Sequence, residues 1–409
     1  MAKTRRDPKG RTLQRGEIYI ANRKLYRFSY TDSMGDRKQF YSKDLLALRD
    51  KEKEVRRDSI DGIDSYSRAN CTLDFLFERF MSVKKGIRSS TRTNYFYSYN
   101  RYVKPKLGKR KIGDIKYSDI RYFYQSLIDN GLSVNTLESV HGVIYSSFKV
   151  AVRDDIVRKN PAEGILAEIK SVNKRNPPKH ALSYAEQTEF LNTLKDPKYD
   201  RWRPLFYFMF GTGCRIGEVI GIRWEDIDFD RNEISINHDI TYYPREELGF
   251  KCAFEVGPPK TDAGNRLVPL LEKVKTELEE ERSNQEKYGY CNTDVVDGMS
   301  GFIFCNRYGK LLKPNNINEV IDRIVSDHNA AEEVRAAKED REPVMIPHFS
   351  CHITRHTFCT RLCENGTNIK LIQQIMGHSD IRTTMDIYAE VTKDKTHSVF
   401  QGLNGDDVL

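Results

Sequence analysis

CHITRHTFCTRLCENGTNIKLIQQIMGHSDIRTTMDIYAEV, residues 351–391, is the stretch whose helix stops decide the fold of the C-terminal part of this chain. The pattern predicts a helix over Thr354–Glu364, which Asn365-Gly366 ends, and a second helix over Ile369–Met376, which Gly377 ends. Because each glycine stop turns the chain back, we expect distant side chains of this segment to meet.

Four side chains of this segment are candidates for chemistry: His352, Arg355, His378 and Tyr388. His352 and Arg355 are three residues apart, so on a helix they share one face and would converge on a single anion. A tyrosine that follows such a basic set is a candidate nucleophile. The alternative for Tyr388 is a place in the core, since the chain has 22 tyrosines.

A zinc site is the alternative for four residues that lie close together, Cys351, His352, His356 and Cys359. Their spacing fits no common zinc finger, and His356 is better explained as a packed residue on the side of the helix opposite Arg355. We therefore predict neither a metal ion nor another cofactor for this chain.

Length and composition indicate two or three domains in a chain that acts in the cytoplasm. At 409 residues the chain is too long for one ordinary domain. No apolar run approaches the roughly 20 residues that span a bilayer, and no apolar signal-peptide core follows the basic N-terminus. The eight cysteines form no CxxC pair and fall mostly in apolar or helical segments, so we expect reduced thiols.

The formal net charge of +8 is unevenly distributed. Residues 1–65 hold 17 basic against 11 acidic side chains and residues 66–175 hold 21 against 10, whereas residues 176–409 hold 29 against 38. A polycationic surface suits nucleic acid, because the release of counterions from phosphates drives binding. We favour nucleic acid over the alternative, a solvated surface with a general attraction to ribosomal RNA.

Residues 1–65 are predicted to form a small N-terminal domain. Three short runs of alternating aromatic and charged residues predict a three-stranded sheet: Glu17–Ala21, Leu25–Tyr30 and Lys38–Tyr41. Ser42 is the expected N-cap of a charged helix that runs to about Arg57. Such a sheet can place its strands in a DNA major groove, although a merely solubilising module fits equally well.

Residues 66–175 are predicted to form a bundle of four or five helices that binds DNA. Apolar residues repeat at helical spacing from Thr72, and Asn160-Pro161 is expected to end the bundle. The basic run Lys104–Lys111 is predicted as a loop, since Pro and Gly interrupt it. We assign packing to most tyrosines of Thr91–Val103 and DNA contact to the cations: Arg92, Arg101, Lys104, Lys106, Lys109, Arg110 and Lys111.

Residues 176–409 are predicted to form a mainly α-helical domain with a small antiparallel sheet, which makes the chain a multi-domain α+β protein. Strands are expected over Glu233–Ile240, Phe254–Val256 and Arg266–Pro269. Lys260 would lie near the turn of a hairpin between the last two, where a lysine can give a proton to a leaving oxygen. Taken alone, such a lysine is a surface charge.

Arg215 belongs to GTGCRIGE, residues 211–218, between the apolar helix Leu205–Phe210 and a helix that is expected to run to about Trp224. A cation in the first turn of a helix is unfavourable unless an anion binds there. Glu218 is placed to orient the guanidinium, and a purely structural Arg215–Glu218 pair is the alternative.

The ordered set of Arg215, Lys260, His352, Arg355, His378 and Tyr388 resembles that of the tyrosine recombinase (phage-integrase) family, as found in conjugative transposons. The resemblance rests on four strings within residues 205–391: TGCRIGEVIGIRWEDID, PPKTDAGNRLVPL, HITRHTFCTRLCENG and IMGHSDIRTTMDIYAEV. Residues 1–65 and 66–175 resemble more loosely the arm-binding and core-binding modules of such integrases. At Thr354 the family usually has leucine, so we expect a change in packing there.

The resemblance implies a role for each residue. Arg215 and Arg355 would clamp the scissile phosphate, and Tyr388 would attack the phosphorus to form a 3′-phosphotyrosine and expel a 5′-hydroxyl. Lys260 would protonate the leaving oxygen, His352 would assist proton transfer at the tyrosine, and His378 would hydrogen-bond the phosphate. The reaction would need neither ATP nor a metal ion.

The resemblance also implies an integrase that inserts and excises a mobile element through a Holliday junction. Its expected partners are double-stranded DNA with core and arm-type sites, three further copies of the chain in a homotetramer, and candidate DNA-bending and excision factors, but no membrane. A non-enzymatic DNA-binding regulator and a type IB topoisomerase-like relaxing enzyme are the alternatives. The tail Thr392–Leu409 is expected to dock on a neighbouring subunit through Val399, Phe400 and Leu403.

Overall fold

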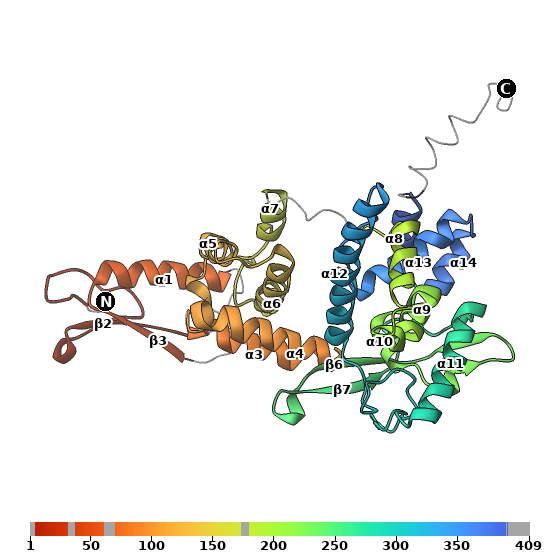
Figure 1. Ribbon diagram of the computed structural model, residues 1–409. Coiled ribbons are helices and arrows are strands. Elements are labelled where there is room, and N and C mark those ends of the chain that lie inside the picture. Colours follow the sequence, from red (N-terminus) through yellow and green to blue (C-terminus); the bar gives the residue numbers. More distant parts are fainter. Residues whose placement is uncertain (1–4, 32–36, 61–69, 173–179, 390, 392–409) are drawn as a thin grey trace, which may run out of the picture. The chain divides into compact units, whose positions relative to one another are not determined.

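The computed structural model describes residues 5–31, 37–60, 70–172, 180–389 and 391. It divides the chain into two compact units, Met1–Asn176 and Pro177–Leu409 (Figure 1). The predicted fold class is confirmed, because a small three-stranded sheet, a helical bundle and a mainly helical part with small sheets follow one another along the chain. The finer division at residues 65 and 175 stays a prediction, and the tail from residue 392 lies outside the described residues.

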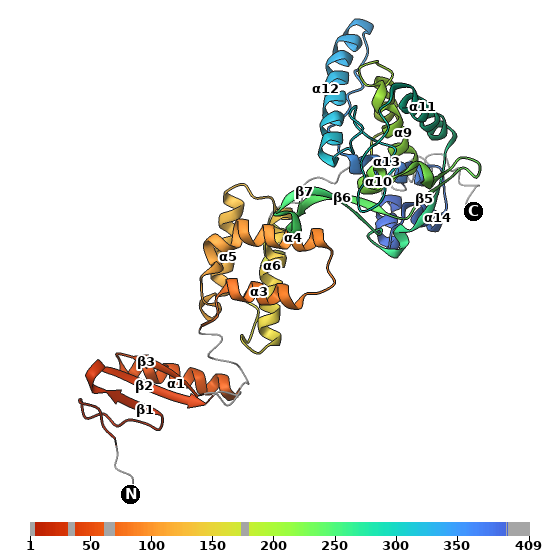
Figure 2. The ribbon, with the colours of Figure 1, turned by 90° about the horizontal axis from the view of Figure 1, so that it is seen from below.

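The N-terminal sheet is antiparallel, in the order β1 (Glu17–Ile20), β2 (Leu25–Thr31), β3 (Arg37–Ser42). Helix α1 (Leu45–Ile60) lies along one face of it, where Leu45 and Leu48 are fully buried (Figure 2). The helix begins later than predicted, because the carboxylate of Asp44, rather than the hydroxyl of Ser42, accepts the hydrogen bond from the Ala47 amide at 3.1 Å.

The helical bundle of the first unit surrounds one apolar core. Its helices are α3 (Leu73–Val83), α4 (Ser89–Ser98), η2 (Tyr99–Gly108), α5 (Tyr117–Asp129), α6 (Val134–Arg153) and α7 (Ile165–Val172). Thr72 and Ser133 cap α3 and α6 by accepting backbone hydrogen bonds. The bundle does not end at Asn160-Pro161 as predicted, since Ile165 and Ile169 of α7 are buried in the same core.

The basic run Lys104–Lys111 is mostly helical, and the prediction of a loop was wrong. The segment η2 continues α4 as a wide, π-type helix that passes through Pro105 and reaches Gly108. Val103 and Leu107 of this segment are buried in the bundle core. Their burial favours a packed helix even though proline cannot donate a backbone hydrogen bond.

The helices of the second unit pack around α9 (Arg203–Thr212), whose Phe206, Phe208 and Met209 are fully buried. Around it lie α8 (Tyr184–Thr193), α10 (Ile216–Gly221), α11 (Glu272–Tyr288), α12 (Pro314–Glu339), α13 (Cys351–Glu364) and α14 (Ile369–Met376). Residues 381–389 are also helical. A helix that is apolar on most sides lies inside its domain, so α9 forms the centre of this unit.

Two small antiparallel sheets complete the second unit. One has the order β4 (Ile227–Asp228), β5 (Glu233–Ile236), β8 (Arg266–Pro269), and the other pairs β6 (Asp239–Arg245) with β7 (Lys251–Gly257). The predicted strand Glu233–Ile240 is thus two strands, separated where the buried His238 ring lies 2.8 Å from the Gly221 carbonyl. The predicted hairpin around Lys260 was also wrong. Residues 258–265 cross from one sheet to the other.

Candidate active site

Arg215 lies at the junction of α9 and α10, where the chain turns sharply. Gly213 ends α9 with a φ of 60°, and a Cβ at this position would lie 2.4 Å from Cδ1 of Phe358. Arg215 is the N-cap of α10 rather than part of its first turn, and α10 ends at Gly221 rather than near Trp224. The backbone N–H and Nη1 of Arg215 donate to Glu218, each at 2.8 Å.

The same guanidinium also reaches a distant segment, because Nη2 of Arg215 donates to the carbonyl of Gly377 at 2.9 Å. The Arg215–Glu218 pair that we considered as a structural alternative therefore exists, and it aims the guanidinium at the segment that precedes His378. Arg215 keeps 29% of its side chain exposed, so it can still meet a ligand.

Arg355 is the other arginine that joins these segments. Helix α13 begins at Cys351 rather than Thr354, because the side chain of Asn318 accepts the first-turn hydrogen bond from the Cys351 amide at 3.0 Å. Arg355 is 4% exposed, and it donates to the carbonyls of Gly213, at 2.7 Å, and Met376. Two arginines thus tie the α9–α10 turn to the end of α14.

Thr354, where the chain departs from the usual leucine, is fully buried beside Arg355. Its hydroxyl donates to the carbonyl of Cys351 at 2.8 Å. A buried hydroxyl costs little when a hydrogen bond within its own helix satisfies it. The substitution therefore leaves the helix and Arg355 in place.

His378 follows Gly377, which ends α14 with a φ of 62°, as the sequence predicts. Nδ1 of His378 lies 2.9 Å from the hydroxyl of Thr384, so the ring is held from the following helix. Burial, then the nearby charges of Arg355 and Arg215, lower the pKa of His378 to about 4. The imidazole is therefore neutral at pH 7.

Tyr388 lies in the helical segment 381–389, half-buried against a small apolar cluster that includes Ile372, Met376 and Ile387. The alternative considered for Tyr388, a place in the core, is therefore only partly realised. His352 is exposed on the first turn of α13.

Lys260 is exposed on the crossing between the two sheets, and no described residue pairs with its ammonium group. The crossing lies against the site, because a Cβ at Gly377 would come within 2.8 Å of the Ala263 carbonyl oxygen. The structure therefore brings the Lys260 loop next to the turn that receives Arg215.

The electrostatics of the site favour an anion. Glu218 is 2% exposed and pairs with both Arg215 and a further arginine, Arg266, while Arg355 lies close to Arg215. Burial, then the charge of Arg215, lower the pKa of Arg355 to about 10. Burial alone would raise the pKa of Glu218, but Arg266 and Arg215 hold it below its usual value. The cluster holds three cations but one carboxylate, which leaves a surplus of positive charge that a phosphate would neutralise.

Arg266 is a member of this cluster that the sequence reasoning missed. It shares its side of β8 with the fully buried Val268, two residues away. Side chains in a strand alternate between its two faces, so an arginine two residues away from an apolar core residue is predicted to point inward as well. That signal was present in PPKTDAGNRLVPL.

The cations predicted to contact DNA in the bundle divide into two groups. Five are exposed, on η2 or just after it: Arg101, Lys104, Lys106, Lys109 and Lys111. Two make internal contacts, since the guanidinium of Arg92 lies 5.1 Å from the centre of the Phe96 ring and Arg110 lies 3.1 Å from Asp119. Most of the tyrosines pack as predicted: Tyr99 stacks on Phe77, whereas Tyr97 is exposed.

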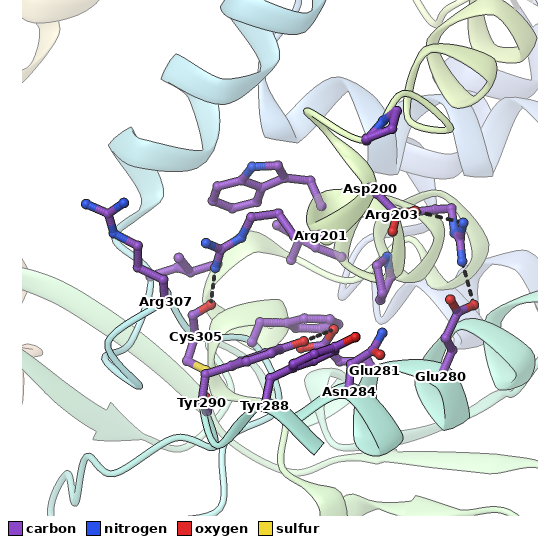
Figure 3. A pocket seen from close by; sticks show the side chains of 16 residues that line it. Asp200, Arg201, Arg203, Glu280, Glu281, Asn284, Tyr288, Tyr290, Cys305 and Arg307 are labelled. Carbon is purple, nitrogen blue, oxygen red and sulfur yellow. Dashed lines mark hydrogen bonds and ion pairs between the residues drawn. The ribbon is translucent and has the colours of Figure 1, made fainter. Parts of the chain in front are cut away.

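A cavity of about 460 Å³ lies elsewhere on the second unit, beside Trp202, Tyr288 and Tyr290 (Figure 3). The charges of its lining balance, since it contains three arginines and three carboxylates, and Arg203 binds Asp200 at 2.9 Å and Glu280 at 2.5 Å. Its lining includes none of the six residues predicted to be catalytic. The surplus of positive charge is therefore a property of the arginine cluster and not of this cavity.

Three further findings concern the described part of the chain. No group of three or more His, Cys, Asp or Glu side chains there is arranged to hold a metal ion. All eight cysteines are free thiols. In the same residues, no helix combines the length and the apolar character needed to cross a membrane.

Comparisons with known proteins match three consecutive parts of the chain to family models. Residues 181–395 match the phage integrase family, residues 1–59 the DNA binding domain of tn916 integrase, and residues 72–128 the N-terminal SAM-like domain of phage integrases. Over 418 aligned positions the chain is 30% identical to the transposase from transposon Tn1545 of Streptococcus pneumoniae, across 99% of this chain and 98% of that protein. The chain belongs to the phage integrase family.

This tyrosine recombinase is of the conjugative-transposon type. It is also 29% identical, over the same lengths, to the transposase from transposon Tn916 of Enterococcus faecalis. A solved structure of the Tn1549 transposon integrase in complex with a circular intermediate DNA has a TM-score of 0.69 and 25% identity, covering 81% of this chain and 99% of that chain. The recombinase is therefore an enzyme that cleaves and rejoins DNA strands in site-specific recombination, and the comparisons support neither a regulator nor a relaxing enzyme.

Proposed function

We propose that this tyrosine recombinase is the integrase of a mobile element and that Arg215, Lys260, His352, Arg355, His378 and Tyr388 are its catalytic residues. The observation that carries the proposal is the junction of Arg215 and Arg355 with the backbone of Gly213, Met376 and Gly377. This junction fixes two guanidinium groups beside the turn that leads to the tyrosine. Fixed cations stabilise the charge that grows on the non-bridging oxygens of a phosphate under attack.

The proposed roles give the following reaction. The Tyr388 oxygen attacks the phosphorus and loses its proton to His352, while the bond between phosphorus and the 5′ oxygen breaks. The 5′ oxygen takes a proton from Lys260, which leaves a 3′-phosphotyrosine and a free 5′-hydroxyl. A 5′-hydroxyl from a second duplex then reverses these steps, so no bond energy is lost to water. The neutral ring of His378 hydrogen-bonds the phosphate.

The wider assembly belongs to the same proposal. Residues 1–65 would bind arm-type sites, and residues 66–175 would bind the core site through the exposed cations of η2. Four copies would pair two core sites and pass through a Holliday junction, with accessory DNA-bending and excision factors setting the direction. The reaction would take place in the cytoplasm.

The test is a nicked suicide duplex that spans the joined ends of the protein's own element, incubated with protein in EDTA. The wild type should form a covalent adduct that protease, but not heating in detergent, removes from the DNA. Tyr388→Phe should form none while it binds the duplex normally. Tyr308→Phe, which changes an exposed tyrosine of the same unit, is the matched control. An adduct with Tyr388→Phe, or none with the wild type, would refute the proposal.

A further inference from the structure

Arg266, the first residue of β8, is a buried cation that contacts three segments of the candidate active site. Its side chain is 5% exposed. Nη1 and Nη2 donate to the two carboxylate oxygens of Glu218 at 3.1 and 2.9 Å. Nε donates to the carbonyl of Ile375 at 2.6 Å, and Nη1 also donates to the carbonyl of Gly264 at 3.1 Å.

These bonds distinguish Arg266 from Arg215, the more exposed of the two arginines that would bind phosphate. Each of its three nitrogens already donates to an acceptor within the protein, and the side chain is almost wholly shielded from solvent. Arg215, by contrast, is 29% exposed. Arg266 therefore acts on the reaction only through the residues that it holds.

One of the three segments is the base of the Lys260 loop. The turn closes on itself, because the Gly264 amide donates to the Thr261 carbonyl at 2.8 Å. Pro259 packs so tightly against Gly264 that a Cβ there would lie 2.5 Å from the Cβ of Pro259. Fixing Gly264 thus fixes both ends of the turn, with Lys260 directly after Pro259.

The second segment is the capping turn of Arg215. Glu218 binds Nη1 of Arg215 through Oε1 and Nη2 of Arg266 through Oε2, so one carboxylate sets the spacing of both guanidinium groups. The third segment is the end of α14, where Ile375 precedes the two residues whose carbonyls receive Arg355 and Arg215. One side chain therefore spans the supports of Lys260 and of both phosphate-binding arginines.

We propose that Arg266 is a positioning residue for the departure of the leaving group. By joining Gly264 to Glu218, it holds the Lys260 loop at a fixed place relative to Arg215, so that the lysine reaches the 5′ oxygen of the phosphate that Arg215 binds. The inference rests on the proposed function, in which Lys260 gives its proton to that oxygen. Loss of Arg266 should then impair proton delivery more than attack by the tyrosine.

A leaving group that needs no proton tests this role directly. Two suicide duplexes are compared, one with the ordinary 5′ oxygen at the cleavage position and one with sulfur in its place. A thiol has a pKa of about 8.5, so the sulfur departs as a thiolate without an acid. Arg266→Met should lose at least about 100-fold in the rate of adduct formation on the oxygen duplex and regain most of it on the sulfur duplex.

Lys260→Met is the reference, because it should show the same loss and the same rescue. Arg266→Lys keeps a positive charge opposite Glu218 but cannot hydrogen-bond to Gly264 and Ile375 at the same time. It should therefore show the same loss on the oxygen duplex and the same rescue on the sulfur duplex, in a stably folded protein. Thermal unfolding and duplex binding by each variant verify that the fold is retained.

The outcomes separate the two levels of the proposal. Rescue of Lys260→Met without rescue of a folded Arg266 variant would overturn the positioning role alone. Wild-type cleavage of the oxygen duplex by Arg266→Lys would overturn it as well. No rescue of Lys260→Met would overturn both the positioning role and the assignment of Lys260 in the proposed function.

Discussion

Glu218→Gln is the substitution that most directly tests how the arginine cluster is held together. Four donors meet this carboxylate: the Arg215 amide at 2.8 Å, Nη1 of Arg215 at 2.8 Å, and Nη1 and Nη2 of Arg266 at 3.1 and 2.9 Å. Each oxygen accepts two of them. The glutamine amide has one oxygen and one NH₂ group, so two donors would face a donor and the buried Arg266 would lose its counter-charge.

The size of the effect follows from burial. Glu218 is 2% and Arg266 is 5% exposed, and removing one partner of a buried ion pair costs about 3–5 kcal/mol. For a unit of this size, each kcal/mol shifts the melting temperature by about 2–4 °C. We expect the melting temperature of the catalytic unit to fall by about 6–20 °C. Glu286→Gln, which breaks an exposed pair with Arg282 at 3.7 Å, should cost less than about 1 kcal/mol.

Urea unfolding as a function of pH provides the readout. Because the pKa of Glu218 is lower in the folded protein than the 4.5 of an unperturbed glutamate, its contribution is fully present above pH 4.5 and is lost as the pH falls through the folded value. The difference between wild type and Glu218→Gln should therefore be constant near neutral pH and shrink in acid. A Glu218→Gln variant as stable as the Glu286→Gln control, or a difference that does not change with pH, would refute this reasoning.

Three further predictions concern the turn, the histidine and the bundle. Gly377→Ala should destabilise the protein by more than about 1 kcal/mol, because φ is 62° and the added Cβ would lie 2.8 Å from the Ala263 carbonyl oxygen. The control Gly142→Ala, in an open position on α6, should be neutral or stabilising, and equal melting temperatures of the two variants would contradict the prediction. The wild type should lose free energy of unfolding as the pH falls from 6.5 toward 4, because His378 has a pKa of about 4 in the folded protein and takes up its proton at higher pH in the unfolded chain. His378→Asn should make this loss smaller. If the free energy of unfolding of the variant varies with pH as that of the wild type does, the prediction is wrong. Replacing the exposed Lys104 and Lys106 with alanine should make duplex binding less dependent on salt. In a plot of the logarithm of the binding constant against the logarithm of the salt concentration, measured by fluorescence anisotropy, the slope should fall in magnitude by up to about two. An unchanged slope would show that these lysines do not contact DNA.

The sequence predicted the local elements of the site better than the connections between them. Gly377 was recognised as a helix stop because a left-handed residue at a helix end is a local property. The pairing of β8 with β5 was missed, because the partner of a strand depends on contacts between distant residues, and the turn-rich residues 257–266 looked like a hairpin. The helical course of η2 was missed for a similar reason, since the burial of Val103 and Leu107 outweighs the local preference of Pro105.

Arg215 and Arg355 bind the distant segments of the site at backbone carbonyls, and every amino acid has a carbonyl. The side chain at Met376 can therefore be replaced in evolution without removing the hydrogen bonds of either arginine. The direction of the backbone is constrained, because Gly213 and Gly377 set it through their positive φ angles. The constraint on this site thus falls on a few glycines, on the cations and on Glu218, whose carboxylate pairs with two of them. A framework built in this way can keep its geometry while about 70% of its residues differ from those of its transposon relatives.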